Sequence, residues 1–395
     1  MKKIVGLLAA AAVLATSVFA ADVSAQVKIN GSLFDYNGAA VDKKDGKEAG
    51  SFSLLTAKGN NDWEEYAKLA VSTDNAGAQV KFWANAKDDD LKIKEYQVWF
   101  KPIDMLKITA GHQDININKE TIEYGGCING FGTDFGYSIN VAVDAFSLDV
   151  GFGTTKNGYF FTDAVGYCGT SEDPAFAFIR DLYAKAAYSA DFGTIGAFFE
   201  LKGKTLNEEK TAAGDPQTVR FGAGYKNTFD ALTIFADVTG TSKSGEGEKL
   251  QAIGFPKDGV FGLAFDAFVQ YAQDALTAKA YLWGDIANFD NKNEKGDKDI
   301  MANNNFVLGF KGRVDYKLDN GLTVYGFFKN GNFLQKELKA EDTEKSSVFV
   351  AEIKAGLSGS VGIAGWDVAI DLNTGKGGKY DKLSVSMPCV ISCSF

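Results

Sequence analysis

The sequence predicts an all-β fold, a transmembrane antiparallel up-and-down β-barrel of about 18 strands, with 16 strands as the alternative. Three observations predict it. The chain of 395 residues begins with an export signal, its strands alternate apolar and polar residues as far as the terminal Phe395, and its connections alternate between short and long. Alternating segments of this kind are typical of barrels that cross a membrane with strands.

The first element is the export signal. Two lysines precede an apolar run from Ile4 to Ala20 that ends in a small-residue cleavage site, which is the pattern of a signal peptide. We therefore expect residues 1–20 to be removed and residues 21–395 to form one barrel domain. No later stretch reaches the roughly 18 uncharged apolar residues of a spanning helix, so any membrane span must be built from strands.

Composition and charge narrow the class of protein. The net charge is −10, and it becomes −12 once the signal peptide and its two lysines are removed, so nucleic acid is not an expected partner. The chain has 44 Gly and 31 Phe but only 5 Pro. This composition suits long antiparallel strands whose aromatic residues face an apolar medium.

The last strand has the clearest period of two. Its apolar face holds Leu383, Val385, Met387, Cys389, Ile391, Cys393 and Phe395, and its polar face holds Lys382, Ser384, Ser386, Ser392 and Ser394. An edge strand of a soluble sandwich has a similar pattern, but about 375 mature residues are many for one sandwich. We expect Met387, Ile391 and Phe395 to mark the strand that closes the barrel by pairing with the strand that starts near Val27.

The connections give the strand count. Eight short turns alternate with nine longer loops, and this arrangement predicts eighteen strands with both termini on the side of the short turns. The stretch from Gly50 to Ser72 holds either one strand or one strand and a structured loop, so a barrel of sixteen strands remains an alternative.

One segment carries a resemblance to a known family. Residues 96–113, from Tyr96 through Pro102 to Gln113, resemble the strand, tight turn, strand and Gly-x-Gln element of bacterial outer-membrane porins, although His112 stands where these commonly have Arg. The resemblance implies an outer-membrane protein of a diderm bacterium that passes small hydrophilic solutes by diffusion, often as a homotrimer. It also implies a third loop, residues 113–134, that folds into the lumen as a constriction. We further expect the last strand to contact the barrel-assembly machinery.

The polar phase of the strands predicts the pore-lining residues. Thirteen basic and nine acidic side chains fall on this phase, Asp149, Asp237 and Asp371 among them, so the wall is mixed and mildly positive. The pore-lining candidates are Lys81, Glu95, Lys107, Glu200, Arg220, Asp266, Lys279, Lys311, Arg313, Asp315, Glu352, Lys354 and Asp367.

The excess acid must lie in loops and turns. Asp114, Glu120, Glu123 and Asp134 belong to the expected constriction loop, and the next loop is acidic as well. We expect an acidic external vestibule that concentrates cations, with modest selectivity for ions.

Candidates for other chemistry are few. His112 is the only histidine, which excludes a His-dependent triad or a multi-histidine metal site within one chain and argues against an enzyme. We expect no cofactor and no metal. Cys127 and Cys168 fall in expected external loops, where export permits a disulfide, but whether these loops meet stays open.

Two other functions stay open beside a general channel. Trp83, Trp99, Tyr281 and Trp283 fall on the lumen phase and suit an aromatic slide in a sugar-selective channel. A place in the aromatic girdle, or packing against an inward-folded loop, explains them equally well. The same barrel also suits a surface adhesin or structural protein that displays variable loops.

Overall fold

The structure is a computed structural model, and the statements below concern the residues that it describes. These are residues 22–37, 51–57, 66–85, 90–115, 131–154, 181–202, 217–244, 261–286, 288–293, 295–301, 305–330, 338–339, 345–346, 351–374 and 383–395. The signal peptide, Glu120, Glu123, Cys127 and Cys168 lie outside them. No helix in the described part of the chain is long and apolar enough to span a membrane.

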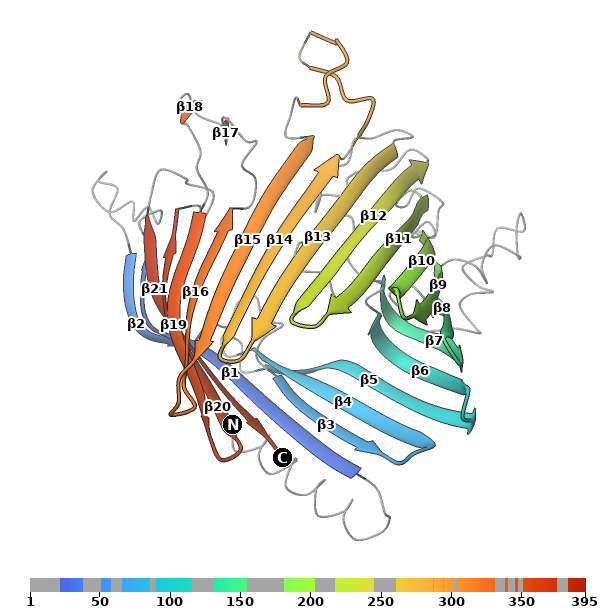
Figure 1. The fold of residues 1–395 in the computed structure, drawn as a ribbon, viewed down its shortest axis with the longest axis horizontal. Helices are drawn as coiled ribbons and strands as arrows, with labels where there is room; N and C mark the ends of the chain where they lie inside the picture. Colours follow the sequence, from blue (N-terminus) through green and yellow to red (C-terminus); the bar gives the residue numbers. More distant parts are fainter. Residues whose placement is uncertain are drawn as a thin grey trace.

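Antiparallel strands form nearly all of the described chain (Figure 1). The first half holds β1 (Asp22–Asn37), β2 (Ser51–Ala57), β3 (Tyr66–Ser72), β4 (Ala76–Asn85), β5 (Asp90–Ile103), β6 (Leu106–Ile115), β7 (Phe131–Val143), β8 (Phe146–Thr154), β9 (Asp181–Ala190) and β10 (Gly193–Lys202). The second half holds β11 (Gln217–Phe229), β12 (Leu232–Ser244), β13 (Phe261–Gln273), β14 (Leu276–Ile286), β15 (Phe306–Lys317), β16 (Thr323–Asn330), β19 (Ala351–Val361), β20 (Ala364–Asn373) and β21 (Ser384–Ser394). The two-residue strands β17 (Leu338–Lys339) and β18 (Lys345–Ser346) pair only with each other.

The barrel closes where the sequence predicts. The first and last strands pair from Gln26 and Ser394 up to Asn37 and Ser384, with Val27 opposite Cys393. The N–H of Phe395 donates to the Ala25 carbonyl at 2.8 Å, and the N–H of Ala25 donates back at 3.1 Å. This pairing joins the first and last strands, which would otherwise be the two edges of the sheet. The result is a closed antiparallel barrel of 18 strands, which confirms the predicted fold class.

The open question of residues 50–72 has a structural answer. The upper half of β1, from Gly31 to Asn37, pairs with β2, and its lower half, from Asp22 to Lys28, pairs with β3. Both partners run in the same direction along the same side of β1, so together they fill one position in the wall. This is why the sheet contains 19 strands although the barrel has 18.

Two-residue turns join several pairs of neighbouring strands. The last of these turns consists of Gly362 and Ile363, between the end of β19 at Val361 and the start of β20 at Ala364. Three of the two-residue turns have the same sequence, an Asp followed by Ala and then Phe or Leu. Asp144, Asp230 and Asp274 have φ of 49°, 48° and 51°, the left-handed conformation that Asp tolerates better than most residues.

These turns allow a direct test of local strain. Replacing Asp274 by Val is expected to destabilise the barrel by about 1–2 kcal/mol, because a Cβ-branched residue is strained in the left-handed region. Replacing it by Gly, which adopts this conformation freely, should change stability little. Urea unfolding of the two variants in lipid vesicles, followed by circular dichroism, measures the difference, and equal midpoints would contradict the assignment.

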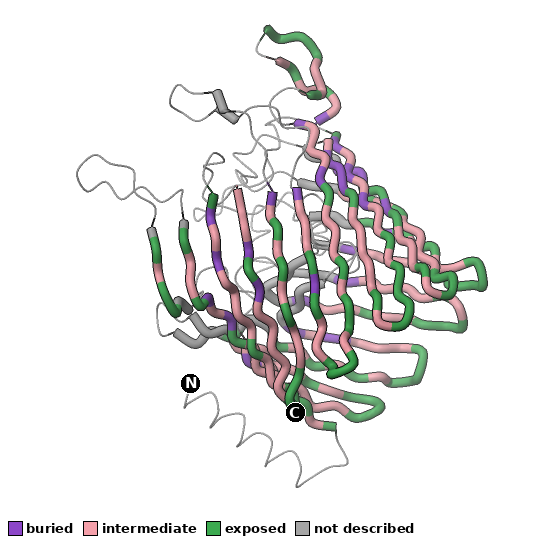
Figure 2. Tube along the Cα trace, turned by 60° about the vertical axis from the view of Figure 1, so that its left-hand side comes forward, coloured by how far each residue is buried: buried purple, intermediate pink, exposed green. Residues whose placement is uncertain are grey.

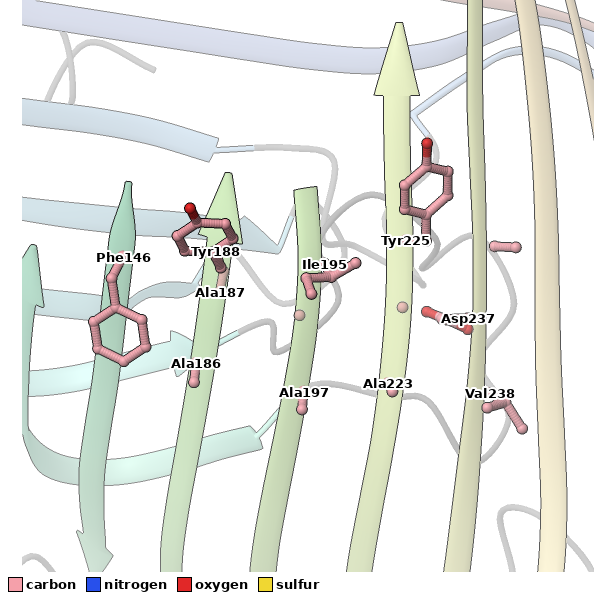
Figure 3. A pocket seen from close by; sticks show the side chains of 13 residues that line it. Phe146, Ala186, Ala187, Tyr188, Ile195, Ala197, Ala223, Tyr225, Asp237 and Val238 are labelled. Carbon is pink, nitrogen blue, oxygen red and sulfur yellow. The ribbon is translucent and has the colours of Figure 1, made fainter. Parts of the chain in front are cut away.

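Large apolar side chains occupy one face of almost every strand. Ile139, Ile195, Val269, Val314 and Ile391 are all exposed, and each lies on the strand phase opposite the charged residues. Figure 2 shows how exposed positions recur along the strands and at the turns. A groove of about 710 Å³ on this apolar face lies over β8–β12, where alanines such as Ala186 and Ala223 lie between Phe146, Tyr188 and Val238 (Figure 3). This is the outer face that a lipid bilayer would cover.

Candidate functional site: the inner wall of the barrel

The opposite strand phase forms the inner wall, and the predicted pore-lining residues lie on it. Glu95 and Glu200 occupy positions in β5 and β10, although their side chains lie outside the described part. The other predicted residues share the phase opposite to the exposed apolar side chains: Lys81, Lys107, Arg220, Asp266, Lys279, Lys311, Arg313, Asp315, Glu352, Lys354 and Asp367.

Basic side chains gather on β14, β15, β16 and β19. Lys279 lies directly opposite Arg313 in the register of β14 and β15, and Lys311 lies opposite Lys329 in that of β15 and β16. Lys354 follows on β19, opposite Phe327. A polar cavity of about 490 Å³ lies in this region, lined by Lys279, Lys311 and Arg313 among others. We call these five cationic residues the basic strip.

Acidic residues neutralise only part of the basic strip. Arg313 donates to Asp315 through Nε at 2.9 Å and Nη2 at 2.7 Å. Lys354 forms ion pairs with Glu352 and, at 3.5 Å, with Asp371. Lys279 and Lys329 form no ion pair within the described part of the chain. The strip therefore keeps a positive potential at these two positions.

Aromatic rings hold the cations of the basic strip in place. The Lys311 ammonium lies 5.3 Å from the Tyr281 ring centre and 5.5 Å from that of Phe327, and the Arg313 guanidinium lies 4.0 Å from the Tyr325 ring. The Tyr325 hydroxyl donates to Asp367 at 2.6 Å. Cation–π contacts of this kind add order to long side chains without removing their charge.

Acidic side chains gather on the neighbouring strands β12, β13 and β14. Asp237 and Asp266 lie directly opposite each other in the register of β12 and β13. Asp285, near the end of β14, lies opposite Ala264. All three are buried. We call these three residues the acidic patch. The inner wall therefore carries its positive and negative charges in separate regions rather than in a uniform mixture.

Two of the predicted aromatic-slide residues pack flat against a neighbouring strand. Trp99 lies over Gly77 and Trp283 over Gly309, so that a Cβ at either glycine would approach the ring closer than 3.0 Å. Trp283 is only 3% exposed. Tyr281 is half-buried beneath Lys311, and the Trp83 side chain lies outside the described part. Tyr183 over Gly151 and Tyr325 over Gly356 repeat this arrangement, which favours a packing role for the rings.

The predicted acidic vestibule is described only in part. Asp114 and Asp134 occupy positions at the ends of β6 and β7, but their side chains, like the loop between them, lie outside the described residues. The loop after β14 is described over residues 288–293 and 295–301, and it stands above the barrel in Figure 1. In these ranges its three acids are matched by three lysines. The hydrogen bond and charge of Lys298, 2.7 Å away, lower the pKa of Asp290.

Sequence reasoning missed three residues of the inner wall. Lys329 and Asp285 each lie one residue from a strand end, and Thr239 is an uncharged member of the Asp237 face. Following the period of two to the strand ends finds the two charged residues, and counting uncharged polar side chains as well finds Thr239. Loop boundaries drawn at the first polar cluster conceal such positions, because a lumen wall is itself polar.

Comparisons with known proteins agree with this geometry. No protein-family model and no curated protein sequence matches the chain. Among solved structures, OpdK and OpdL of Pseudomonas aeruginosa both superpose with a TM-score of 0.54, at 10% and 12% identity, over 95% of this chain and 98% and 99% of theirs. An anion-selective porin from Comamonas acidovorans superposes with a TM-score of 0.52 at 11% identity, over 95% of this chain and 100% of its own. Since identities this low establish the fold alone, the conclusion is that the chain has the fold of the outer-membrane porins.

Proposed function

We propose that the protein is a channel of a bacterial outer membrane through which small hydrophilic solutes and ions diffuse passively. The observation that carries the proposal is the inner wall: a closed barrel of 18 strands whose inner phase is charged while its outer phase is apolar. A barrel of this size leaves an aqueous passage unless a plug fills it. Charged side chains facing the passage keep it wet.

The proposal includes a lumen with both signs of charge. The basic strip supports attraction of anions, while the acidic patch and the predicted acidic loops support attraction of cations, so we expect modest selectivity. It also includes export, with cleavage near Ala20, assembly through the last strand, and a homotrimer. The apolar outer face supports a lipid-embedded barrel and offers surface for such an assembly.

A sugar-selective channel is the second candidate, and the packing of the aromatic rings weighs against it. A sugar slide needs ring faces open to the lumen, whereas Trp283 lies against Gly309 and is buried. The sequence has a single histidine, which argues against a His-dependent enzyme. The alternative of a barrel-anchored adhesin is distinguished from a channel by the bilayer recording described next.

Planar bilayer recording of the refolded protein tests the proposed function. We expect stepwise conductance increments and a reversal potential near zero in a salt gradient, because the wall carries both charges. Liposome swelling with uncharged sugars of graded size then measures the solute limit. A folded protein, shown by circular dichroism, that produces no channels would favour the adhesin instead.

A further inference from the structure

The acidic patch places like charges against each other inside the wall. Asp237 and Asp266 are direct cross-strand neighbours and each is only 6% exposed. Asp285 is 4% exposed and lies diagonally across from Asp266, which faces Trp283 on β14. Like charges directly opposite in a sheet repel each other.

Two buried threonines next to the patch provide a second, independent observation. Thr239 is 0% exposed and Thr241 is 2% exposed, and both lie on the same face of β12 as Asp237. Within the described chain, the hydroxyl oxygens of both threonines and Oδ2 of Asp266 have no hydrogen-bond partner. Buried polar atoms almost always have one, and each exception calls for an explanation such as an ion.

The register places these oxygens around a small side chain. Thr239, Ala264 and Asp285 form one row across β12, β13 and β14, and Asp237 and Asp266 belong to the next row. Ala264 fills little of the space between them. Adjacent strands are about 4.8 Å apart, so side chains on one face of neighbouring strands can share one ligand. Thr241 lies one row further, opposite Arg220, and is left out of the site.

We propose that this part of the inner wall binds one calcium ion, held by the carboxylates of Asp237 and Asp266 and by the hydroxyl of Thr239. The described residues contain no group of three or more Asp, Glu, His or Cys spaced to hold a metal ion, so water completes the shell and Asp285 contributes charge from outside it. An all-oxygen donor set favours a hard cation such as calcium. The site does not depend on the proposed transport function.

Thermal unfolding of the full-length refolded barrel in detergent micelles tests the proposal. Calcium chloride is compared with choline chloride at equal ionic strength and with a chelator. We expect calcium to raise the Tm of the wild type by several degrees, because a ligand that binds only the folded state stabilises it. D266N should lose this rise, and T239V should need more calcium to reach it. D149N changes another inner-wall acid, one that accepts a hydrogen bond from Asn140 at 2.8 Å, and should keep the full rise.

The stability of D266N in the absence of calcium distinguishes a metal site from an aspartate that stabilises the fold by itself. In chelator, D266N should be at least as stable as the wild type, because the substitution removes the repulsion between Asp237 and Asp266. The proposal would be overturned if calcium did not change the Tm of the wild type, or if calcium raised the Tm of D266N as much as that of the wild type. A Tm that follows pH but not calcium would also overturn it, since a proton shared by the two carboxyls would then explain the patch.

Terbium luminescence keeps the test valid if D266N does not fold. Terbium occupies calcium sites, and Trp283 lies directly opposite Asp266, so excitation of tryptophan in the wild type should sensitise terbium emission. We expect saturation at one ion per chain and loss of the emission on adding calcium. Absence of sensitised emission, or emission that calcium does not displace, would count against the site.

Discussion

Replacing Lys279 and Lys329 together by glutamate is expected to move the ion preference of the channel toward cations. These two lysines form no ion pair within the described part of the chain, so their replacement leaves no acid without a partner. Each lies opposite another cation of the basic strip. Since a unit charge at about 4 Å contributes about 1 kcal/mol even in water, we expect the cation-to-anion permeability ratio to rise roughly tenfold.

The reversal potential in a salt gradient measures this change. A variant with Lys292 and Lys295 replaced by glutamate is the matched control, because it alters the net charge equally in the exposed loop above the barrel. Its reversal potential should change much less, and the effect in the wall variant should shrink at high salt, where charges are screened. Equal reversal potentials in the wild type and the wall variant would show that the basic strip does not line the permeation path.

Replacing Gly309 by Ala is expected to destabilise the barrel by about 1–3 kcal/mol, the usual cost of overpacking. The new Cβ would meet the ring of Trp283, which lies directly opposite on β14 and is too buried to move aside. Gly326, one strand away, has no atom within 4 Å of the position of an added Cβ. The G326A variant should therefore remain within about 0.5 kcal/mol of the wild type.

A double-mutant cycle identifies the cause. If the ring is the obstacle, G309A should lower the free energy of unfolding much less in a W283A background, because truncation of the ring removes the clash. Urea unfolding in vesicles, followed by circular dichroism, gives the change in unfolding free energy for G309A, for W283A and for the double variant, each relative to the wild type. Additive effects of the two substitutions would assign the loss to backbone conformation rather than to the ring.

The sequence predicted the barrel because its strands obey one simple rule. An apolar phase facing lipid and a polar phase facing water repeat with a period of two, and the closing pair of β1 and β21 follows from the two ends of the chain. The division of one wall position between β2 and β3 could not be predicted, because a strand that pairs along only half of its neighbour shows the same two-residue alternation as any other strand.

The inner wall was predicted residue by residue but not as an arrangement. Phase places Lys279, Arg313 and Asp266 on the side opposite the apolar face, and their lining of a pore stays a prediction. Which of them face each other depends on register between strands that are separated by long loops, and no single strand contains that information. The segregation into a basic strip and an acidic patch therefore became visible only once β12 to β16 were aligned. The packing of Trp283 on Gly309 was hidden for the same reason.

The divided wall position beside β1 also affects how the barrel is held together. Ile29 and Asn30 lie between the ends of the two partners on that side, whereas β21 pairs with both of them on the other side. β2 ends at Ala57 and β3 begins at Tyr66. On that side, within the described residues, β1 connects to the rest of the circle through β3, which pairs with β4, while β2 is paired with β1 alone. Closure of the wall at this position therefore depends on the short pairing of Asp22–Lys28 with Tyr66–Ser72.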